Sequence, residues 1–294
     1  MPSLKSIRTQ IASKKSTQKI TRAMKLVSAA RLRGAQDAIL AARPYANALV
    51  EVIGQVAERA GAEAHPLLEK REAKRITLVP ITSDRGLAGG FNANIFRAVA
   101  RFMTDHADAE LTLDIVGKKG RDYFRRRKVT IKHEVPGASG ATAAELARQV
   151  GSIVVDAFMK GQTDAVYLIY NEFKSAVQQR VVIEPLLPVT RASVIPSGEA
   201  PTAKDATAID FAYEPSKREL LDVLIPQFVD SQIYRALLES VASEFGARMT
   251  AMENATNNAR EMIADLTLKY NRVRQAAITK ELMEIVSGAE ALKG

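Results

Sequence analysis

The sequence predicts two long helices that fold back on each other as an antiparallel two-stranded coiled coil, with an α/β domain inserted between them. Two observations lead to this fold class. Near both ends of the chain, apolar and small residues recur at intervals of three and four, which is the helical period. Between the ends, short β-rich segments alternate with helical segments, which is typical of βαβ units and of a mostly parallel sheet with covered faces.

A long first helix is expected over residues 1–58. Pro44 removes one backbone hydrogen bond, so a kink is expected there, with the helix continuing beyond it. Small side chains on the contact face would let the backbone of a second helix approach closely. The face predicted to meet that helix carries Ile20, Met24, Val27, Gly34, Ala38, Ala41 and Tyr45, with Arg31 in the remaining position.

A Rossmann-like domain of about five strands is expected over residues 74–195. Its predicted strands are the β-rich segments "RITLVPI", "LTLDIVG", "KVTIKHEV", "DAVYLIYNEF" and "QQRVVIEPLLPV", and its predicted helices are "ANIFRAVARFM" and "TAAELARQVGSIVVDAFMK". The fourth strand leads directly into the fifth, which predicts a hairpin and one antiparallel edge. Residues 196–208, rich in Pro, Ala, Thr and Ser, are expected to form an exposed loop.

The helical period returns over residues 209–290. A helix of roughly 70 of these residues would be about 105 Å long at 1.5 Å per residue, which is too long to pack inside a compact domain. We therefore expect the two helices to pair as a shaft that carries the α/β domain. The predicted contact face of the second helix carries Val241, Phe245, Met252, Ala255, Ala259, Met262, Leu266 and Val273, together with Arg248 and Lys269.

The segment "SDRGLAGGFN", residues 83–92, joins a predicted strand to a predicted helix through three glycines. Nucleotide-binding folds hold phosphates on backbone N–H groups at such a turn. This segment fits neither G-x-G-x-x-G nor the P-loop pattern, and it has no lysine to reach a phosphate. We therefore predict a tight turn in which glycine supplies positive φ and Asn92 caps the helix, with no cofactor.

Catalytic and metal-binding chemistry find little support in the sequence. The chain has no cysteine, and its three histidines (His65, His106 and His133) are too far apart for a helical metal pair. No acidic residue belongs to a recognisable histidine or nucleophile motif. No apolar run approaches the roughly 18 residues that cross a bilayer. Outside the glycine turn, the residues therefore suggest no catalytic site, and no direct bilayer insertion is expected.

Positive charge is concentrated at the N-terminus. Nine basic residues and no acidic residue precede Asp37, so this segment carries the whole formal charge of +9 and the rest of the chain sums to about zero. Composition leaves three interpretations open: a patch for nucleic acid or acidic lipid, an organelle transit peptide, or a helix facing an acidic protein partner. The helical pattern continues well past residue 36, which counts against a transit peptide.

The C-terminal part of the second helix is polar around much of its circumference and then ends in the apolar segment "LMEIVSGAEAL". A helix that is polar nearly all round is normally solvated or enclosed by a partner. An exposed apolar end is unfavourable unless another protein surrounds it. Both features predict a sleeve-like partner around this end.

Three stretches resemble the gamma subunit of rotary ATP synthases: "KITRAMKLVSAARLRGAQ" at 19–36, "ITSDRGLAGGFN" at 81–92, and the run from "IYRALLESVASEFGARM" to "ITKELMEIVSGAEAL". The resemblance implies a non-catalytic central rotor shaft inside a hexamer of alternating alpha and beta subunits. Its α/β domain would lie against the epsilon subunit and the membrane-embedded proton-driven ring. Because the N-terminus does not look like a transit peptide, a peripheral position on the cytoplasmic side of a bacterial inner membrane is expected.

The resemblance also implies particular partner contacts. Met24 and Lys25 of the first helix are expected at a position along the helix pair similar to that of the contact residues of the second helix, which are given at the end of this paragraph. Arg85 and Ala88 of the glycine turn are expected to contact partners, with Arg85 near acidic levers of the beta subunits. Contacts with the inner loops of the hexamer are implied at four positions of the second helix: Arg274, Gln275, Thr279 and Glu281.

The residues alone leave two other functions open: a nucleic-acid-binding coiled coil that uses the basic helix, and an enzyme that uses the glycine turn. A nucleic-acid binder should place aromatic or base-reading side chains near its charge, yet the first 36 residues contain no aromatic residue. An enzyme should be active as an isolated chain. We therefore expect no nucleic-acid partner, and the resemblance implies that ATP is made on beta rather than on this chain.

Overall fold

The structure is a computed structural model. It describes most of the chain, in four ranges: 3–60, 65–137, 142–189 and 217–291. The predicted loop at 196–208 lies outside the described residues. The chain divides into two units, which are treated one at a time: residues 1–28 with 249–294, and residues 29–248.

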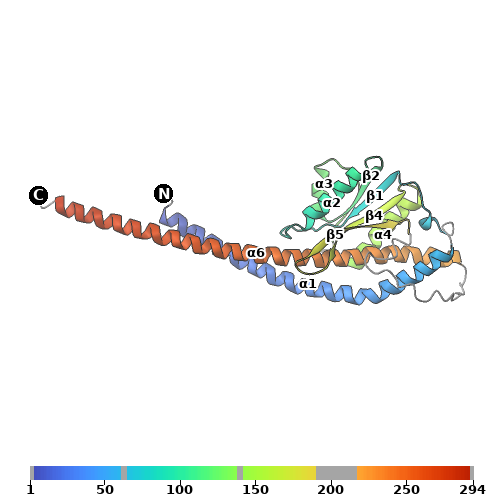
Figure 1. The fold of residues 1–294 in the computed structure, drawn as a ribbon, viewed down its shortest axis with the longest axis horizontal. Helices are drawn as coiled ribbons and strands as arrows, with labels where there is room; N and C mark the ends of the chain where they lie inside the picture. The colour runs from blue at the N-terminus through green and yellow to red at the C-terminus, as the bar shows by residue number, and fades with distance from the viewer. Residues whose placement is uncertain (1–2, 61–64, 138–141, 190–216, 292–294) are drawn as a thin grey trace. The chain divides into compact units, whose positions relative to one another are not determined.

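Two long helices contribute to both units. α1 spans Leu4–Ala60 and α6 spans Lys217–Ala291 (Figure 1). Pro44 lies inside α1, so the predicted continuation of the first helix past this proline is confirmed. α6 likewise contains Pro226. The helical period of the sequence therefore identified both long helices correctly.

In the first unit, the start of α1 pairs with the second half of α6. Thr21 Oγ1 lies 2.7 Å from Thr256 Oγ1, and Lys25 Nζ lies 2.6 Å from Glu253 Oε1. Residue numbers rise along α1 as they fall along α6 between these two contacts, so the helices run in opposite directions. The predicted antiparallel coiled coil is confirmed for this part of the chain.

The contact face of α1 is shifted by one residue from the predicted face. Thr21 and Ser28 are 8% and 2% exposed, whereas Ile20 and Val27, which the prediction placed on this face, are 57% and 54% exposed. Farther along, in the second unit, Ala35 is buried and Gly34 is exposed. The prediction followed the larger apolar residues, but the helix buries a neighbouring row that contains small and hydroxyl side chains.

Polar residues fit this buried face because their hydroxyl groups are paired. Ser28 Oγ donates to Met24 O at 2.8 Å, and Thr256 Oγ1 donates to Met252 O at 2.7 Å. A buried hydroxyl without a partner would cost about 1–3 kcal/mol. Hydroxyl side chains are also small, which lets the two backbones approach closely. These bonds explain why an apolar periodicity did not locate the face.

The contact face predicted for α6 agrees better with the structure. Met252 and Ala259 are buried as expected, at 5% and 4% exposed. Met262 is 47% exposed, and its neighbour Ile263 is partly buried instead. The α6 side of the pair therefore follows its apolar period more faithfully than the α1 side.

A five-stranded sheet forms the centre of the second unit, in the order β3-β2-β1-β4-β5. β1 to β4 run parallel, and β5 pairs antiparallel with β4 through the predicted hairpin. All five predicted strands and the antiparallel edge are confirmed. The strands are β1 (Arg75–Pro80), β2 (Glu110–Val116), β3 (Ile131–Val135), β4 (Ala165–Phe173) and β5 (Gln179–Leu187).

Helices cover both faces of this sheet (Figure 1). α2, Phe91–Asp105, and α3, Lys118–Arg125, pack on one face, and α4, Ala143–Met159, packs on the other. The single turn η1, Pro66–Leu68, precedes β1. α2 and α4 were predicted. α3 was not, because it is short and highly charged.

The first half of α6 belongs to the core of the second unit. Leu221, Phe228 and Ile233 are fully buried in a cluster that also contains residues of α4 and β4. Ala247 joins the cluster on the α2 side of the sheet. Burying one large apolar side chain contributes about 1.5–3 kcal/mol. This half of α6 is therefore anchored to the sheet by hydrophobic burial.

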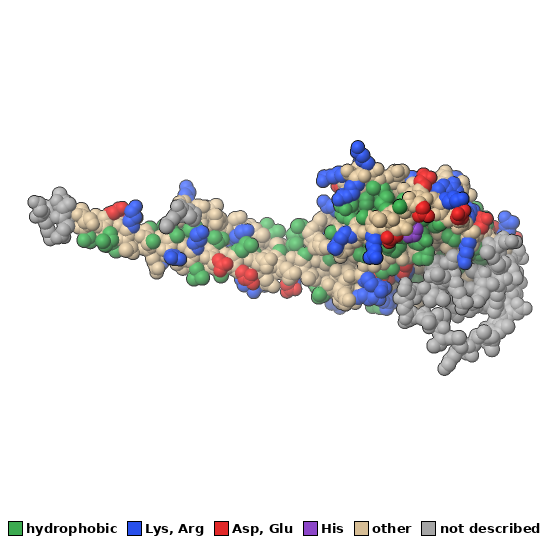
Figure 2. All heavy atoms as spheres, turned by 45° about the horizontal axis from the view of Figure 1, so that its top comes forward, with side chains coloured by type: hydrophobic (Ala, Val, Ile, Leu, Met, Phe, Trp, Pro, Cys, Tyr) green, Lys and Arg blue, Asp and Glu red, His purple; other side chains and the backbone are tan. Residues whose placement is uncertain are grey.

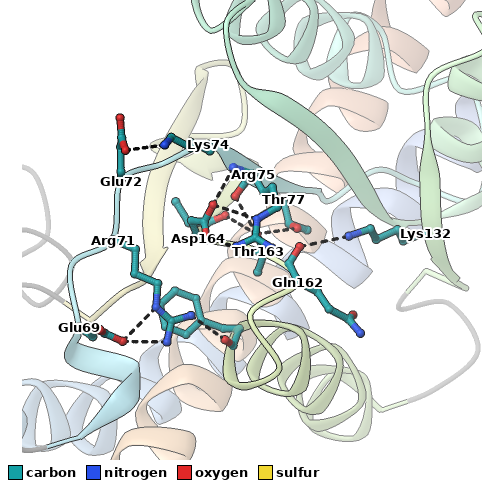
Figure 3. A network of polar contacts seen from close by, with 12 residues as sticks. Glu69, Arg71, Glu72, Lys74, Arg75, Thr77, Lys132, Gln162, Thr163 and Asp164 are labelled. Atoms are coloured by element: carbon teal, nitrogen blue, oxygen red, sulfur yellow. Dashed lines mark hydrogen bonds and ion pairs between the residues drawn. The ribbon is translucent and has the colours of Figure 1, made fainter.

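A polar network ties the amino ends of the central strands together (Figure 3). Arg75 Nη2 donates to Asp164 Oδ1 at 2.7 Å, and Arg75 Nε donates to Asp164 Oδ2 at 3.1 Å. These hydrogen bonds lower the pKa of the Asp164 carboxyl group. Thr77 Oγ1 donates to Thr163 Oγ1 at 3.0 Å. Because Arg75 begins β1 and Asp164 directly precedes β4, the network holds these parallel strands in register.

The one-residue shift of the α1 contact face can be tested by a matched pair of substitutions. Ser28→Lys would bury an ammonium group in the helix pair and should destabilise it by about 2 kcal/mol or more. Val27→Lys places the same side chain on an exposed position and should change stability by less than about 0.5 kcal/mol. Urea unfolding followed by circular dichroism measures both. Equal effects would contradict the observed register.

Candidate partner-binding surface

The glycine turn after β1 is held by its own hydrogen bonds. Asn92 Oδ1 accepts from the Ser83 N–H at 3.1 Å, and Asn92 Nδ2 donates to Ser83 Oγ at 2.8 Å. The predicted role of Asn92 as the helix cap is therefore wrong, because Gly90 occupies the cap position. Gly89 has a φ of 56°, as predicted for a glycine of this turn, and Leu87 adopts a positive φ of 63° as well.

α6 occupies the edge of the sheet where this fold class would bind a nucleotide. In open α/β sheets, ligands bind beyond the carboxyl ends of the strands, where the strand order reverses. Here that point lies between β1 and β4. Ser243 Oγ donates to Asn171 O of β4 at 2.9 Å, and Arg248 Nη2 donates to Gly86 O at 3.2 Å. The turn thus presents a carbonyl group to an arginine of α6, which suits attachment of the helix rather than phosphate binding.

Arg248 is also the counter-ion of a buried carboxylate. Its Nη2 lies 2.6 Å from Glu244 Oε1, and the two side chains are 8% and 18% exposed. Burial raises the pKa of Glu244, and the attraction of Arg248 opposes this effect. The Arg248 guanidinium also lies 5.7 Å from the centre of the Phe245 ring. One arginine therefore joins α6 to the glycine turn and neutralises the carboxylate beside it.

The two predicted contact residues of the turn differ in exposure. Arg85 is exposed, and its backbone oxygen accepts from Ser83 Oγ at 2.7 Å and from Arg248 Nη2 at 3.5 Å. Ala88 is 3% exposed and packs in the core beneath α2. The Arg85 side chain is thus accessible to another molecule, and that of Ala88 is not. Partner contact at both positions stays a prediction.

The four predicted contact residues of α6 are all exposed: Arg274, Gln275, Thr279 and Glu281. Thr279 Oγ1 donates to Gln275 O at 3.0 Å, so this hydroxyl is used within the helix. From residue 278 to residue 289, every described side chain is exposed, including Met283 at 59% and Ile285 at 68%. No other described segment covers this part of α6, so its polar and apolar side chains are open to a partner.

The predicted alignment of Met24 and Lys25 with these residues is wrong. Lys25 faces Glu253, which precedes Arg274 by 21 residues. This separation corresponds to about 32 Å of helix. The register therefore places the start of α1, near Leu4, opposite Arg274. The offset between two antiparallel helices depends on which side chains interlock, and the sequence resemblance did not contain that information.

Positive charge gathers on two elements. On the first 28 residues, Lys25 is the one basic residue with an ion pair in the described structure. The second element was missed: seven basic residues and one acidic residue lie between Lys118 and Lys128. Figure 2 shows Lys and Arg side chains over the α/β unit. The total charge of the residues after the N-terminal segment is about zero. That total concealed this cluster, although the segment "KKGRDYFRRRK" contains it.

Within the described ranges, no group of residues is arranged to hold a metal ion, and no helix is long and apolar enough to cross a membrane. The features that are present are a long antiparallel helix pair, an α/β domain and one helix, α6, that contributes to both. Together they define a stalk-type protein, built from long paired helices and a folded α/β domain.

The comparisons with known proteins specify the family. The family model described as ATP synthase matches residues 3–292. The ATP synthase gamma chain of Anaeromyxobacter sp. (strain Fw109-5) is 54% identical, and that of Geobacter sp. (strain M21) is 47% identical, each over 100% of both chains. The chain belongs to the ATP synthase gamma-chain family.

Solved structures show the same architecture. A chain in the central stalk and c-ring of the Tetrahymena thermophila mitochondrial ATP synthase has a TM-score of 0.59 and 31% identity, covering 80% of this chain and 99% of that one. A chain of the Euglena gracilis mitochondrial ATP synthase has a TM-score of 0.66 and 20% identity, covering 98% and 94%. The second likeness shows the fold alone.

The attachment of α6 to the glycine turn predicts a pH-dependent mutational effect. Arg248→Ala removes the donor to Gly86 O and leaves the Glu244 carboxylate buried without its cation, which should cost about 3 kcal/mol near neutral pH. A raised folded-state pKa means that protonation favours the folded state. The loss of folding stability caused by Arg248→Ala should therefore become smaller towards about pH 5.

Urea unfolding at both pH values measures this effect, and Arg33→Ala is the matched control. Arg33 is exposed on α1, so its removal should change stability by less than about 0.5 kcal/mol at either pH. A loss for Arg248→Ala that grows on acidification would contradict the assigned role of Glu244.

Proposed function

We propose that this chain is the non-catalytic central rotor shaft of an ATP synthase, which couples rotation of a proton-driven ring to conformational changes in the catalytic beta subunits. The observation that carries the proposal is the full-length match to gamma chains, at 54% identity in one relative. The uncovered polar and apolar end of α6 supports it, because such a surface suits enclosure by other subunits.

The shaft role follows from the continuity of α6. It is one helix of 75 residues, whose first half is buried against the sheet and whose second half pairs with α1. A torque applied to the α/β domain therefore passes into the contact surface through an unbroken, hydrogen-bonded backbone. A single asymmetric helix pair turning inside a ring of beta subunits would present a different side to each of them in turn.

The proposed partners divide between the helix pair and the α/β domain. The alpha and beta subunits would surround the helix pair, and the epsilon subunit and the membrane-embedded ring would meet the α/β domain. The solved Tetrahymena assembly, which joins a central stalk to a c-ring, supports this arrangement. The proposed location is peripheral, on the cytoplasmic side of a bacterial inner membrane.

The proposed contacts use charged and amide side-chain groups that have no hydrogen-bond or ion-pair partner among the described residues. Arg274 and Gln275 offer donors, and Glu281 offers an acceptor, on exposed turns of α6. Hydrogen bonds that involve a charged group contribute about 1.5–3 kcal/mol each when a partner excludes water. Arg85 would supply a further cation for acidic levers on beta.

Arg274→Ala tests the proposed contact surface in the assembled complex. Loss of one charge-assisted contact should lower coupled ATP synthesis by about tenfold, with little effect on the folding of the isolated chain. Arg260→Ala is the matched control, because Arg260 is an exposed arginine on the part of α6 that pairs with α1. If the Arg274 variant assembles and synthesises ATP like the wild type, the assignment is wrong.

A further inference from the structure

A concentrated positive charge lies on α3 and the turn after it. Two ion pairs offset part of this charge: Arg121 with Asp122 at 2.9 Å, and Arg125 with Glu134 at 2.7 Å. The other five cations have no carboxylate partner among the described residues. We call this set the α3 basic surface: Lys118, Lys119, Arg121, Arg125, Arg126, Arg127 and Lys128.

The packing of α3 turns these cations outward. Gly120 N donates to Thr82 Oγ1 at 3.0 Å, and a Cβ on Gly120 would lie 2.7 Å from that oxygen and 2.9 Å from Ile115 Cγ2. Phe124, 2% exposed, fills the core beneath the helix. The inward side of α3 is therefore occupied by a glycine and a phenylalanine, and the helix is ordered before any ligand arrives, which lowers the entropic cost of binding.

Arg127 is also held in place. Its guanidinium lies 3.7 Å from the centre of the Tyr123 ring, which stacks on Phe96 at 3.8 Å. Stacking uses the face of the guanidinium and leaves its in-plane N–H groups free to donate. Four of the seven cations are arginines, and arginine binds phosphate groups through two parallel hydrogen bonds.

We propose that the α3 basic surface binds the phosphate headgroups of an anionic lipid bilayer, without insertion into it. Between Lys118 and Lys128 no apolar side chain is exposed, since Phe124 is buried and Tyr123 is half-buried. Protein interfaces centre on aromatic or arginine anchors seated in well-packed, desolvated pockets, and this surface has no exposed apolar side chain to surround its arginines. Clusters of four to eight Lys and Arg are the usual means of binding anionic lipid surfaces.

Binding of the α3 basic surface to lipid headgroups is a property additional to the proposed shaft function. Attraction to an anionic leaflet falls off within about 8 Å at physiological salt. The α3 basic surface would therefore act only where the α/β domain comes close to the membrane. There it would form an electrostatic contact with the membrane surface, which added salt would weaken. A shaft that lacked it would still transmit torque, so the two proposals can fail separately.

The test uses the full chain and vesicles of phosphatidylcholine with and without phosphatidylglycerol. The triple variant Arg126→Gln, Arg127→Gln, Lys128→Gln removes three cations that form no ion pair with any described residue. Each cation near such a surface changes affinity by about fivefold, so binding to the phosphatidylglycerol vesicles should weaken by roughly 100-fold. Binding of the wild type should also fall with added salt.

The matched control removes the same charge from α1, by Lys15→Gln, Lys19→Gln and Arg22→Gln, all at exposed positions. Its vesicle binding should stay within about tenfold of the wild type. Unfolding midpoints of both variants should match the wild type. Equal losses in both variants, or a larger loss in the control, would overturn the proposal. So would an α3 variant that keeps vesicle binding but no longer co-purifies with membrane-sector subunits, because the partner would then be a protein.

Discussion

Burial of the first half of α6 against the sheet is the interaction on which the rest of the structure depends. Leu221, Phe228 and Ile233 fill the core, and Ser243 and Arg248 then bond to the carboxyl edge of the central strands. The same helix continues, without a break, into the antiparallel pair. A fold that elsewhere opens this edge to a nucleotide here uses it to attach a helix, and this explains why a glycine turn of familiar outline carries no phosphate-binding pattern.

The helix pair depends on a different kind of contact. Its buried face on α1 contains hydroxyl residues such as Thr21 and Ser28, whose hydrogen bonds are satisfied within and between the helices. Larger apolar residues such as Ile20 and Val27 remain on the outside. Part of the apolar surface of the pair is therefore exposed, where other molecules can contact it. That arrangement suits a stalk whose function lies in contacts with surrounding subunits.

Periodicity and turn chemistry were enough to predict most of the fold. The β-rich segments located all five strands, the direct step from the fourth segment to the fifth located the hairpin, and the three-four spacing located both long helices. The α1 face was misplaced because small polar residues carry no apolar signal. α3 was missed because only Gly120 and Phe124 face inward on it.

The candidate contacts were predicted less completely, because exposure and helix offset arise from three-dimensional packing. Arg274 and Glu281 are accessible as expected, but Ala88 is buried, and Lys25 lies about 32 Å of helix away from the height assigned to it. The basic cluster on α3 can be recognised in the sequence as the segment 118–128. Its significance required knowing that the sheet side of the helix contains none of those cations.

The most direct measurement follows the chain itself while the complex works. Because the sequence has no cysteine, Ala107→Cys at an exposed turn of the α/β domain would provide one unique labelling site. In a complex assembled from this chain with alpha and beta subunits, with the hexamer fixed to a surface, a bead on that cysteine reports rotation. We predict unidirectional rotation of the bead during ATP hydrolysis. Sustained hydrolysis with a bead that stays fixed relative to the hexamer would contradict the account.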